Sequence, residues 1–524
     1  IALKQPRVYF GELLPEYSIV GASGSPQEYD GNGSTKVTYE GGGGVSLGNL
    51  FTRLAFAVHY KQKNLVLNDK ASAKGAKIIF NRDPRQIVSK VAPFLKVDRD
   101  PYPIVDSQSG DIVWMGDGYT TANNYPHSER QSLSSLTSDS LSQNDKTARQ
   151  PNDSINYIRN SVKATVDAYT GKITLYQWDQ SDPVLKAWMS VFPGIVKPKA
   201  DMPTSILDHV RYPEDLFEVQ RSTLAMYHIN NPVVFYNVGD KWTVPQDPTD
   251  PGANQPPYYV LAGPPTGSTN SATTTQFQLT SPMNVNNSTY LAAYMSVDSN
   301  PGPDYGKITV LRLPAHSSAV QGPEQIHNVI TGNATITKDI SLFNSVGGGS
   351  SMIQGNLLTL PVGGSFLYVE PLYNQTSNGS GGTYPILVRV IAVYGDKIGY
   401  GATLANALSD IVQGNPTGST ISQVGSGTND NSSGTSTQPP SPSTSTSPPA
   451  GSSPAPPATS QQALVNRLNA AYEKLTSAYS SGDFAKIGEA QQKVNSLVAQ
   501  YLQAFGSPSS SKSSTPAPNP KPTG

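Results

Sequence analysis

Residues 414–460 consist mainly of Gly, Ser, Thr and Pro and contain almost no large apolar side chains. Such a segment cannot bury enough apolar surface to offset the entropy lost on ordering, so we expect a flexible, semi-extended linker. It divides the chain into a long region, 1–413, and a short one, 461–505. The short region shows two apolar stripes at helical spacing and predicts an αα-hairpin, while the Ser- and Pro-rich tail 506–524 is expected to be disordered.

Composition narrows the classes of function that are open to the chain. The formal net charge is −1, so no general attraction to nucleic acid is implied. Cys is absent, which excludes disulfides, thiolate catalysis and iron–sulfur clusters. No apolar run approaches the ~20 residues that span a bilayer, and the chain begins with Ile1 rather than Met. We therefore expect a fragment whose upstream part is missing.

The long region mixes short β-prone runs with short helical patterns, which indicates an α+β fold with mixed, mostly antiparallel sheets. Clusters of Gly, Pro and Asn separate the expected strands 276–279, 290–297, 307–313, 356–361, 365–372 and 385–394. Helices are expected at 84–91, 323–330 and 404–411. The region 1–413 is treated as one unit, with a division into mixed 1–245 and β-rich 271–405 subdomains as the alternative.

Three further segments carry the clearest local signals. Runs 162–168 and 172–178 flank Thr170-Gly171 and predict a β-hairpin, and the pairs Asp182-Pro183 and Pro213-Glu214 predict helix starts. A helix is also predicted over 47–59, where apolar residues recur at helical spacing: Leu47, Leu50, Phe51, Leu54, Ala55 and Val58. Residues 128–150 are rich in Ser, Gln and Asp with little periodicity, and are interpreted as a surface loop or a disordered insertion.

Three acidic residues, Asp98, Asp100 and Asp117, are candidate binding carboxylates. Carboxylates on loops can bind calcium when several of them converge, but the EF-hand spacing is absent. The ordinary alternative is that Asp100-Pro101 and Asp117-Gly118 mark turns. The sequence therefore assigns no metal ion and no cofactor.

Four further residues, Tyr119, Trp178, His209 and His228, are candidates for a binding surface. Tyr119 belongs to an aromatic group with a polar edge, which can form a platform for a sugar or a peptide, although core packing is the simpler explanation. His209 and His228 flank the helix that starts at Pro213 and could lie near each other. Half-buried His residues that serve only as hydrogen-bond partners are the more common case.

No pattern in the chain identifies a reaction. A zincin-type His pair is absent, and so is a Gly-x-Ser-x-Gly motif in a strand-to-helix setting. A catalytic triad or a pair of carboxylates could still assemble from distant residues. The sequence favours a protein that is not an enzyme and leaves the question open.

Several long blocks, in order along the chain, resemble one known family. They are 91–103, 116–121, 156–169, 211–217 with 227–228, 322–326 and 367–373. The second of these begins Gly116-Asp117-Gly118-Tyr119, and the first contains the run DRDPYP at 98–103. The chain resembles the uncharacterised protein family 0182, found mostly in actinobacteria, over residues 6–411. The segment 471–502 also fits.

This resemblance implies a multi-pass membrane protein with N-terminal transmembrane helices, a large extracytoplasmic domain, a Pro- and Gly-rich linker and a helical end. The chain would be that domain and its tail, in the cell membrane and facing outward. The family has no agreed activity, so no catalytic residue is carried over.

We expect a domain that binds or scaffolds in the cell envelope, with the membrane, an envelope protein or a ligand as partner. One alternative is a transport-associated ligand-binding domain, which predicts a pocket near Tyr119, Trp178 and His228. The other is a metal-assisted envelope hydrolase, which predicts that Asp98, Asp100 and Asp117 converge beside a His.

Overall fold

A computed structural model describes residues 3–22, 28–30, 35–142, 149–263, 275–313, 320–346, 350–376 and 385–413, with nine separate helical positions between 467 and 497. The chain divides into two compact units, Ile1–Val424 and Gly425–Gly524. The predicted linker 414–460 and tail 506–524 lie outside the described residues, as does most of the predicted hairpin 461–505. These three predictions therefore stay predictions.

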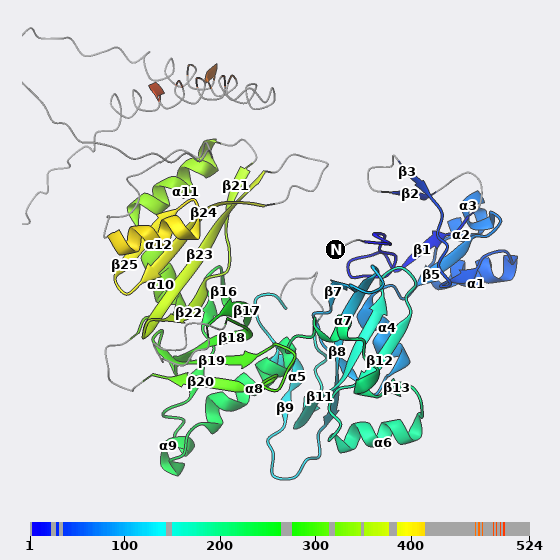
Figure 1. Ribbon diagram of the computed structural model, residues 1–524, viewed down its shortest axis with the longest axis horizontal. Helices are drawn as coiled ribbons and strands as arrows, with labels where there is room; N and C mark the ends of the chain where they lie inside the picture. The colour runs from blue at the N-terminus through cyan, green and yellow to red at the C-terminus, as the bar shows by residue number, and fades with distance from the viewer. Residues whose placement is uncertain are drawn as a thin grey trace, which may run out of the picture. The chain divides into compact units, whose positions relative to one another are not determined.

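A six-stranded sheet forms the centre of the N-terminal part of the first unit (Figure 1). Its order is β13-β12-β11-β8-β6, and β7 also pairs with β8. The bounds are β6 Lys96–Val97, β7 Tyr102–Val105, β8 Ile112–Ala122, β11 Tyr157–Asp167, β12 Ile173–Gln177 and β13 Val196–Lys197. Strands β11 and β12 are antiparallel and joined through Gly171, whose φ of 72° suits a residue without a Cβ. The predicted hairpin is thus confirmed.

Helices begin where a local signal sets them. Asp83 and Asp182 are the N-caps of α4 (Pro84–Val91) and α6 (Pro183–Val191), and each accepts hydrogen bonds from the first-turn backbone. Helix α8 (Glu214–Tyr227) follows Pro213 as predicted. The other helices of this part are α1 Leu50–His59, α2 Asn64–Leu67, α3 Asp69–Ser72, α5 Leu133–Leu136, the 3₁₀ helix Lys199–Asp201, α7 Thr204–Leu207 and α9 Pro232–Tyr236.

Smaller sheets accompany the central one. A three-stranded sheet has the order β1-β5-β4 and packs beside α1, and the pairs β2–β3, β9–β10 and β15–β16 form ribbons. Their bounds are β1 Tyr17–Val20, β2 Glu28–Asp30, β3 Thr35–Val37, β4 Val45–Ser46, β5 Lys77–Phe80, β9 Gln131–Ser132, β10 Ser154–Ile155, β15 Gln246–Asp247 and β16 Asp250–Asn254.

Two antiparallel five-stranded sheets follow, one ordered β14-β18-β19-β20 with β17 on β18, the other β21-β23-β24-β25 with β22 on β23. Their bounds are β14 Trp242–Thr243, β17 Tyr258–Ala262, β18 Gln276–Val285, β19 Leu291–Asp298, β20 Ile308–Arg312, β21 Ser350–Gln354, β22 Leu358–Val362, β23 Ser365–Thr376, β24 Ile386–Tyr394 and β25 Lys397–Gly401. The helices here are α10 Pro323–Thr331, α11 Ala334–Val346 and α12 Leu404–Gln413. The α+β class is confirmed.

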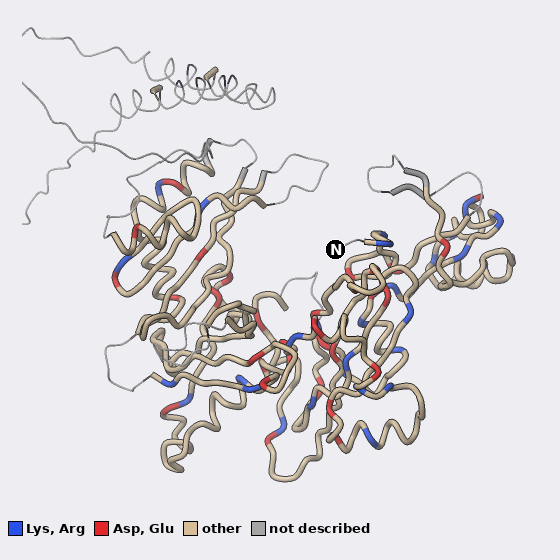
Figure 2. The backbone as a smooth tube through the Cα atoms, in the orientation of Figure 1, with Lys and Arg blue, Asp and Glu red and all other residues tan. Residues whose placement is uncertain are grey.

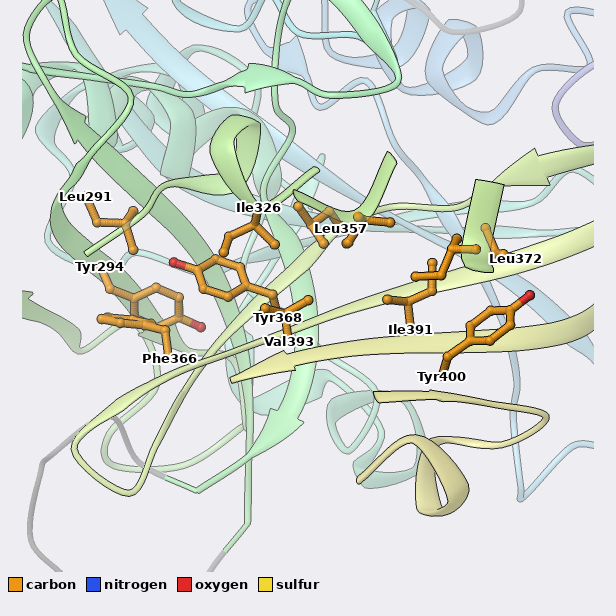
Figure 3. Close-up of a cluster of buried hydrophobic side chains, with 12 residues drawn as sticks. Leu291, Tyr294, Ile326, Leu357, Phe366, Tyr368, Leu372, Ile391, Val393 and Tyr400 are labelled. Atoms are coloured by element: carbon orange, nitrogen blue, oxygen red, sulfur yellow. The ribbon is translucent and has the colours of Figure 1, made fainter. Parts of the chain in front are cut away.

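The largest apolar cluster among the described residues joins the second of these sheets, helices α10 and α11, and Leu291 and Tyr294 of β19 in the first sheet (Figure 3). Alternate residues of β23, Phe366, Tyr368 and Leu372, point into it and meet Ile326 and Ile330 of α10. The odd-numbered residues of β23 pack on α12 instead. Both faces of this sheet are therefore covered, which explains why its central strands are almost continuously apolar.

Candidate functional site at a buried carboxylate cluster

The first turn of α8 brings acidic side chains into the protein interior. Asp215 and Glu218 have no exposed surface, and Glu214 is half-buried beside them. Pro213, the N-cap, has no side chain that can accept a hydrogen bond, and a carboxylate oxygen of Asp98 accepts one from the Asp215 backbone N–H at 3.3 Å. A residue more than a hundred positions away in the sequence thus stabilises the start of the helix.

Arg99 is the cationic centre of this cluster. Its guanidinium forms ion pairs with Asp139 at 2.6 Å, Glu218 at 3.0 Å and Asp215 at 3.3 Å, and none of the four side chains is more than 2% exposed. Arg221, one turn further along α8, pairs with the other oxygen of Glu218 at 3.0 Å. The planar guanidinium can satisfy several carboxylates at once, which a lysine ammonium does less well.

Strands β8 and β11 contribute a second set of charged and polar side chains beside those of α8 and Arg99. The Tyr119 hydroxyl donates a hydrogen bond to Asp98, and Lys163 forms an ion pair with Asp117. Asn160 also donates to Asp117, at 2.8 Å. Because β8 and β11 are antiparallel with Lys163 opposite Asp117, the sheet register itself places the two charges together.

The cluster contains more carboxyl groups than cationic side chains. Seven carboxyl groups share four cations: Asp98, Asp100, Asp117, Asp139, Glu214, Asp215 and Glu218, with Arg99, Lys163, Arg211 and Arg221. Burial raises the pKa of Glu218 to about 8, against the opposing effect of Arg99 and Arg221. Burial also raises the pKa of Asp215 and of Asp117. The cluster can therefore retain protons near neutral pH.

A cavity of about 570 Å³ adjoins the cluster, and Arg99 and Gln150 line it from the cluster side. The Gln150 amide donates to Asp215 at 2.6 Å. Most charged residues of the lining are basic: Arg85, Lys90, Lys96, Arg99 and Arg149, against Asp83 alone. This lining favours an anionic ligand.

Five of the seven residues predicted from the sequence lie in or beside the cluster, and one of them is Trp178, whose ring centroid lies 5.3 Å from the Lys163 ammonium. Asp98, Asp117 and Tyr119 are buried in it, and Asp100 pairs with Arg211 at its edge, at 2.6 Å. Among the described residues, no set of three or more His, Cys, Asp or Glu is placed to hold a metal ion.

The two predicted His residues lie elsewhere, and Trp178 also contacts a cation outside the cluster. Trp178 stacks under the Lys199 ammonium at 3.6 Å from its ring centroid, and His228 stacks on Trp242 at 3.6 Å. His209 is exposed. Helix α8, about 21 Å long at 1.5 Å per residue, lies between His209 and His228 in the sequence, and the possibility that the two His residues lie near each other stays a prediction.

The binding pocket predicted near Tyr119, Trp178 and His228 is not the cavity observed here, since none of the three lines it. Tyr119 is fully buried and faces Asp98.

Sequence reasoning missed Arg99, Asp139, Gln150 and Arg221. Asp139 and Gln150 fall in the segment 128–150, whose interpretation as a surface loop holds for the exposed residues 128–130 and is wrong for 131–142 and for Gln150: β9 and α5 form there, and Leu133, Asp139 and Gln150 are buried. Residues 143–148 of that segment lie outside the described part. One sequence feature indicates buried charge here. Glu218 and Arg221 lie on a predicted helix next to the apolar residues Leu216, Phe217 and Val219.

The fold and the cluster together define a class: an α+β domain with an interior charge network and a basic cavity beside it. The family model described as "Uncharacterised protein family (UPF0182)" matches residues 1–343, and the chain belongs to this family. No solved structure matches the chain.

Curated relatives carry the same family name. A UPF0182 protein of Frankia casuarinae is 47% identical over 412 residues, covering 78% of this chain and 39% of the relative. UPF0182 proteins of Rhodococcus jostii and Mycobacteroides abscessus are 44% and 43% identical over 96% of this chain and 50% of their own lengths. The chain thus spans half or less of these relatives. No helix among the described residues has the length and apolarity required to cross a bilayer.

Proposed function

We propose that this chain is the extracytoplasmic part of a membrane-anchored envelope protein and that it acts by binding an anionic ligand. The observation that carries the proposal is the basic cavity beside the carboxylate cluster, with five cations and one carboxylate in its lining. The resemblance to a membrane-protein family and the greater length of the curated relatives support the membrane attachment.

The cavity's cations divide into fixed and available groups. Arg99 is held by three carboxylates, and Arg85 pairs with Asp83 at 2.7 Å, so both contribute to the field without being free to move. Lys90 is exposed on α4, and Lys96 is half-buried and pairs with Asp153, whose carboxylate is 44% exposed. Lys90 and Lys96 are therefore the side chains that would meet a phosphate or carboxylate group of the ligand.

The cluster supports binding rather than catalysis. Five of its carboxyl groups, Asp98, Asp117, Asp139, Asp215 and Glu218, are engaged with Arg99, Arg221, Lys163 or Tyr119, Asp100 pairs with Arg211, and the cluster residues among those described that line the cavity are Arg99 and Gln150. A proton donor or base must lie within hydrogen-bond reach of a substrate. The cluster instead fixes the wall of the cavity, as supporting residues do in rigid binding sites.

Binding of inorganic tripolyphosphate to the chain, followed by isothermal titration calorimetry, tests the ligand class. Lys90→Gln/Lys96→Gln should weaken the affinity at least about tenfold, because each lost charge contact is worth roughly 1 kcal/mol or more. Lys172→Gln/Lys186→Gln, at two exposed positions outside the cavity lining, is the matched control. Equal affinities for the two double variants, or no binding by the unaltered chain, would refute the proposal.

The orientation can be tested separately because the chain contains no Cys. In the membrane-anchored protein, a Lys186→Cys substitution places the one thiol of this chain at an exposed site, and the protein without the substitution is the labelling control. An impermeant maleimide added to intact cells should label it. Labelling only after lysis would place this domain on the cytoplasmic side.

A further inference from the structure

Helix α1 exposes a continuous apolar face. Leu50, Phe51, Leu54 and Val58 are 59%, 76%, 50% and 72% exposed. Apolar residues at helical spacing normally form the packed face of a helix. Here the packing is done by the opposite side, where Phe56, Ala57 and Tyr60 join the core under β1 and β5.

The exposed residues lie on one side of the helix. Leu50, Leu54 and Val58 follow one another at intervals of four, and Phe51 lies next to that row. A helix that is apolar on both sides is expected to be covered on both. Leu67 of α2, which packs against α1, is exposed as well.

The sequence of this helix and its flanks is mainly basic, and Glu16 is an acidic neighbour beside Tyr60 at the helix end. Residues 41–68 contain Arg53, Lys61 and Lys63 and no Asp or Glu, although the whole chain has a formal net charge of −1. From the start of α1 to the end of α3 the basic residues are Arg53, Lys61, Lys63 and Lys70, and the acidic one is Asp69 (Figure 2). Basic residues beside an apolar helical face are the composition of helices that lie in the interface of an anionic bilayer.

We propose that the face formed by Leu50, Phe51, Leu54 and Val58 inserts into the surface of a bilayer that contains anionic lipids. The face is a convex ridge on a helix of ten residues, about 15 Å long. Residues that anchor protein partners usually fill pockets. A ridge of separate, highly exposed apolar side chains is better matched by a lipid bilayer, whose acyl chains can rearrange around each side chain. Lys61 and Lys63, which follow the helix, then face the headgroups.

The test is co-sedimentation of the full chain with vesicles of phosphatidylcholine alone and of phosphatidylcholine with 30% phosphatidylglycerol. We expect binding to the anionic vesicles that is at least tenfold stronger than to the neutral ones. Phe51→Ser/Leu54→Ser should abolish it, and Lys61→Gln/Lys63→Gln should remove the preference for phosphatidylglycerol.

Two matched controls accompany these variants. Val233→Ser/Tyr236→Ser removes an exposed apolar pair of the same spacing from α9, and Lys172→Gln/Lys186→Gln removes two exposed charges elsewhere. Both should bind vesicles as the unaltered chain does. Because the cavity variant Lys90→Gln/Lys96→Gln should also keep vesicle binding, failure here and failure of the cavity proposal are separate results.

Equal binding by Phe51→Ser/Leu54→Ser and the unaltered chain, or no binding to any vesicle, would overturn the proposal. So would a result in which Phe51→Ser/Leu54→Ser leaves vesicle binding unchanged and converts a dimer to a monomer in sedimentation velocity. That outcome would make the face an interface between copies of the chain.

Discussion

Arg99 joins segments that are far apart in the sequence. It contacts Asp139, forty residues away, and Glu218, 119 residues away, and all three side chains are buried. Buried ion pairs add little net stability compared with an apolar replacement of all partners, but removing one partner leaves uncompensated charge in the interior. The folded state can therefore bury these carboxylates only while Arg99 is present to pair with them.

Replacing Arg99 by Leu should lower the free energy of unfolding by about 3–5 kcal/mol, because three carboxyl groups lose their cation. Urea denaturation followed by circular dichroism measures the change. Arg159→Leu is the control: Arg159 pairs with Asp179 at 2.8 Å but is 42% exposed, so the loss should stay within about 1 kcal/mol. Similar losses for both variants would contradict a special role for Arg99.

The same cluster predicts how stability changes with pH. The pKa of Glu218 rises from 4.5 to about 8 on folding, mainly because of burial. The folded state then binds more protons than the unfolded state between these values, so the contribution is complete below pH 4.5 and is lost as the pH rises toward 8. We expect the free energy of unfolding to fall by on the order of 1–3 kcal/mol from pH 5.5 to 8.5.

Urea titrations at several pH values provide the measurement for this prediction. Glu218→Gln should show a flatter pH dependence because the titrating group is gone. A parent protein whose stability rises over this window, or a variant with the same slope, would count against the assignment.

At the scale of elements, local signals predicted where helices begin, and tertiary contacts decided the rest. The Asp–Pro pairs before α4 and α6 and the Pro213 start of α8 could be read directly, since a cap acts on the next two or three residues. Six of the ten strands in the two C-terminal sheets, β18, β19, β20, β22, β23 and β24, match predicted strands, because their apolar runs are bounded by turn residues; β14, β17, β21 and β25 were not predicted.

Other elements depend on packing that the sequence does not display. Helix α11, with Thr335, Ile336, Thr337 and Ile340, was not predicted, because β-branched residues disfavour a helix until Ile336 is buried against the sheet. The segment around Asp139 was taken for a loop because its partner Arg99 lies in a distant part of the chain. The cluster was therefore only half predictable: its acids stand in recognisable motifs, while their pairing depends on the register of β8, β11 and α8.

Asp182 illustrates a cap that also ties a helix to a sheet. Its carboxylate accepts hydrogen bonds from the backbone of Val184 and Leu185, and from Thr120 and Ser161 at 2.7 Å each. Asp182→Ala should lower the free energy of unfolding by about 3 kcal/mol, since it removes a cap and leaves buried hydroxyls without their acceptor.

Asp83 is the comparison for this prediction, because it caps α4 with the same Asp–Pro sequence but is only half-buried, and its substitution also removes the ion pair with Arg85 at 2.7 Å. Asp83→Ala should cost about 1 kcal/mol. Thermal and urea unfolding of the two variants would show the difference. Equal losses would mean that the contacts of Asp182 with β8 and β11 add nothing to the cap.

At the scale of the whole molecule, one apolar cluster is shared across the boundary expected near residue 245. Tyr119 and Phe217 from before it meet Leu279, Met295 and Val297 from after it, and Lys163 donates a hydrogen bond to the Tyr305 hydroxyl at 3.0 Å. Residues that share a core usually unfold together. The first sheet, α8 and the sheet β14-β18-β19-β20 are thus expected to behave as one cooperative unit.

A fragment ending at residue 245 should accordingly lack a cooperative unfolding transition, because Phe217 and Lys163 lose the partners that cover them. Residues 1–413 should unfold in one transition by calorimetry. A fragment that melts sharply at the temperature of the longer chain would instead support independent subdomains.

The long sequence separations within the charge cluster set an order of events during synthesis. Arg99 leaves the ribosome more than a hundred residues before Asp215 and Glu218 exist, and Lys163 is made 142 residues before Tyr305. Until α8 has been made, Arg99 lacks two of its three carboxylate partners, Asp215 and Glu218, and such late, non-local contacts make folding slow. The nascent domain must therefore stay incompletely closed for several seconds at ordinary translation rates, a window in which a chaperone has a physical reason to hold it.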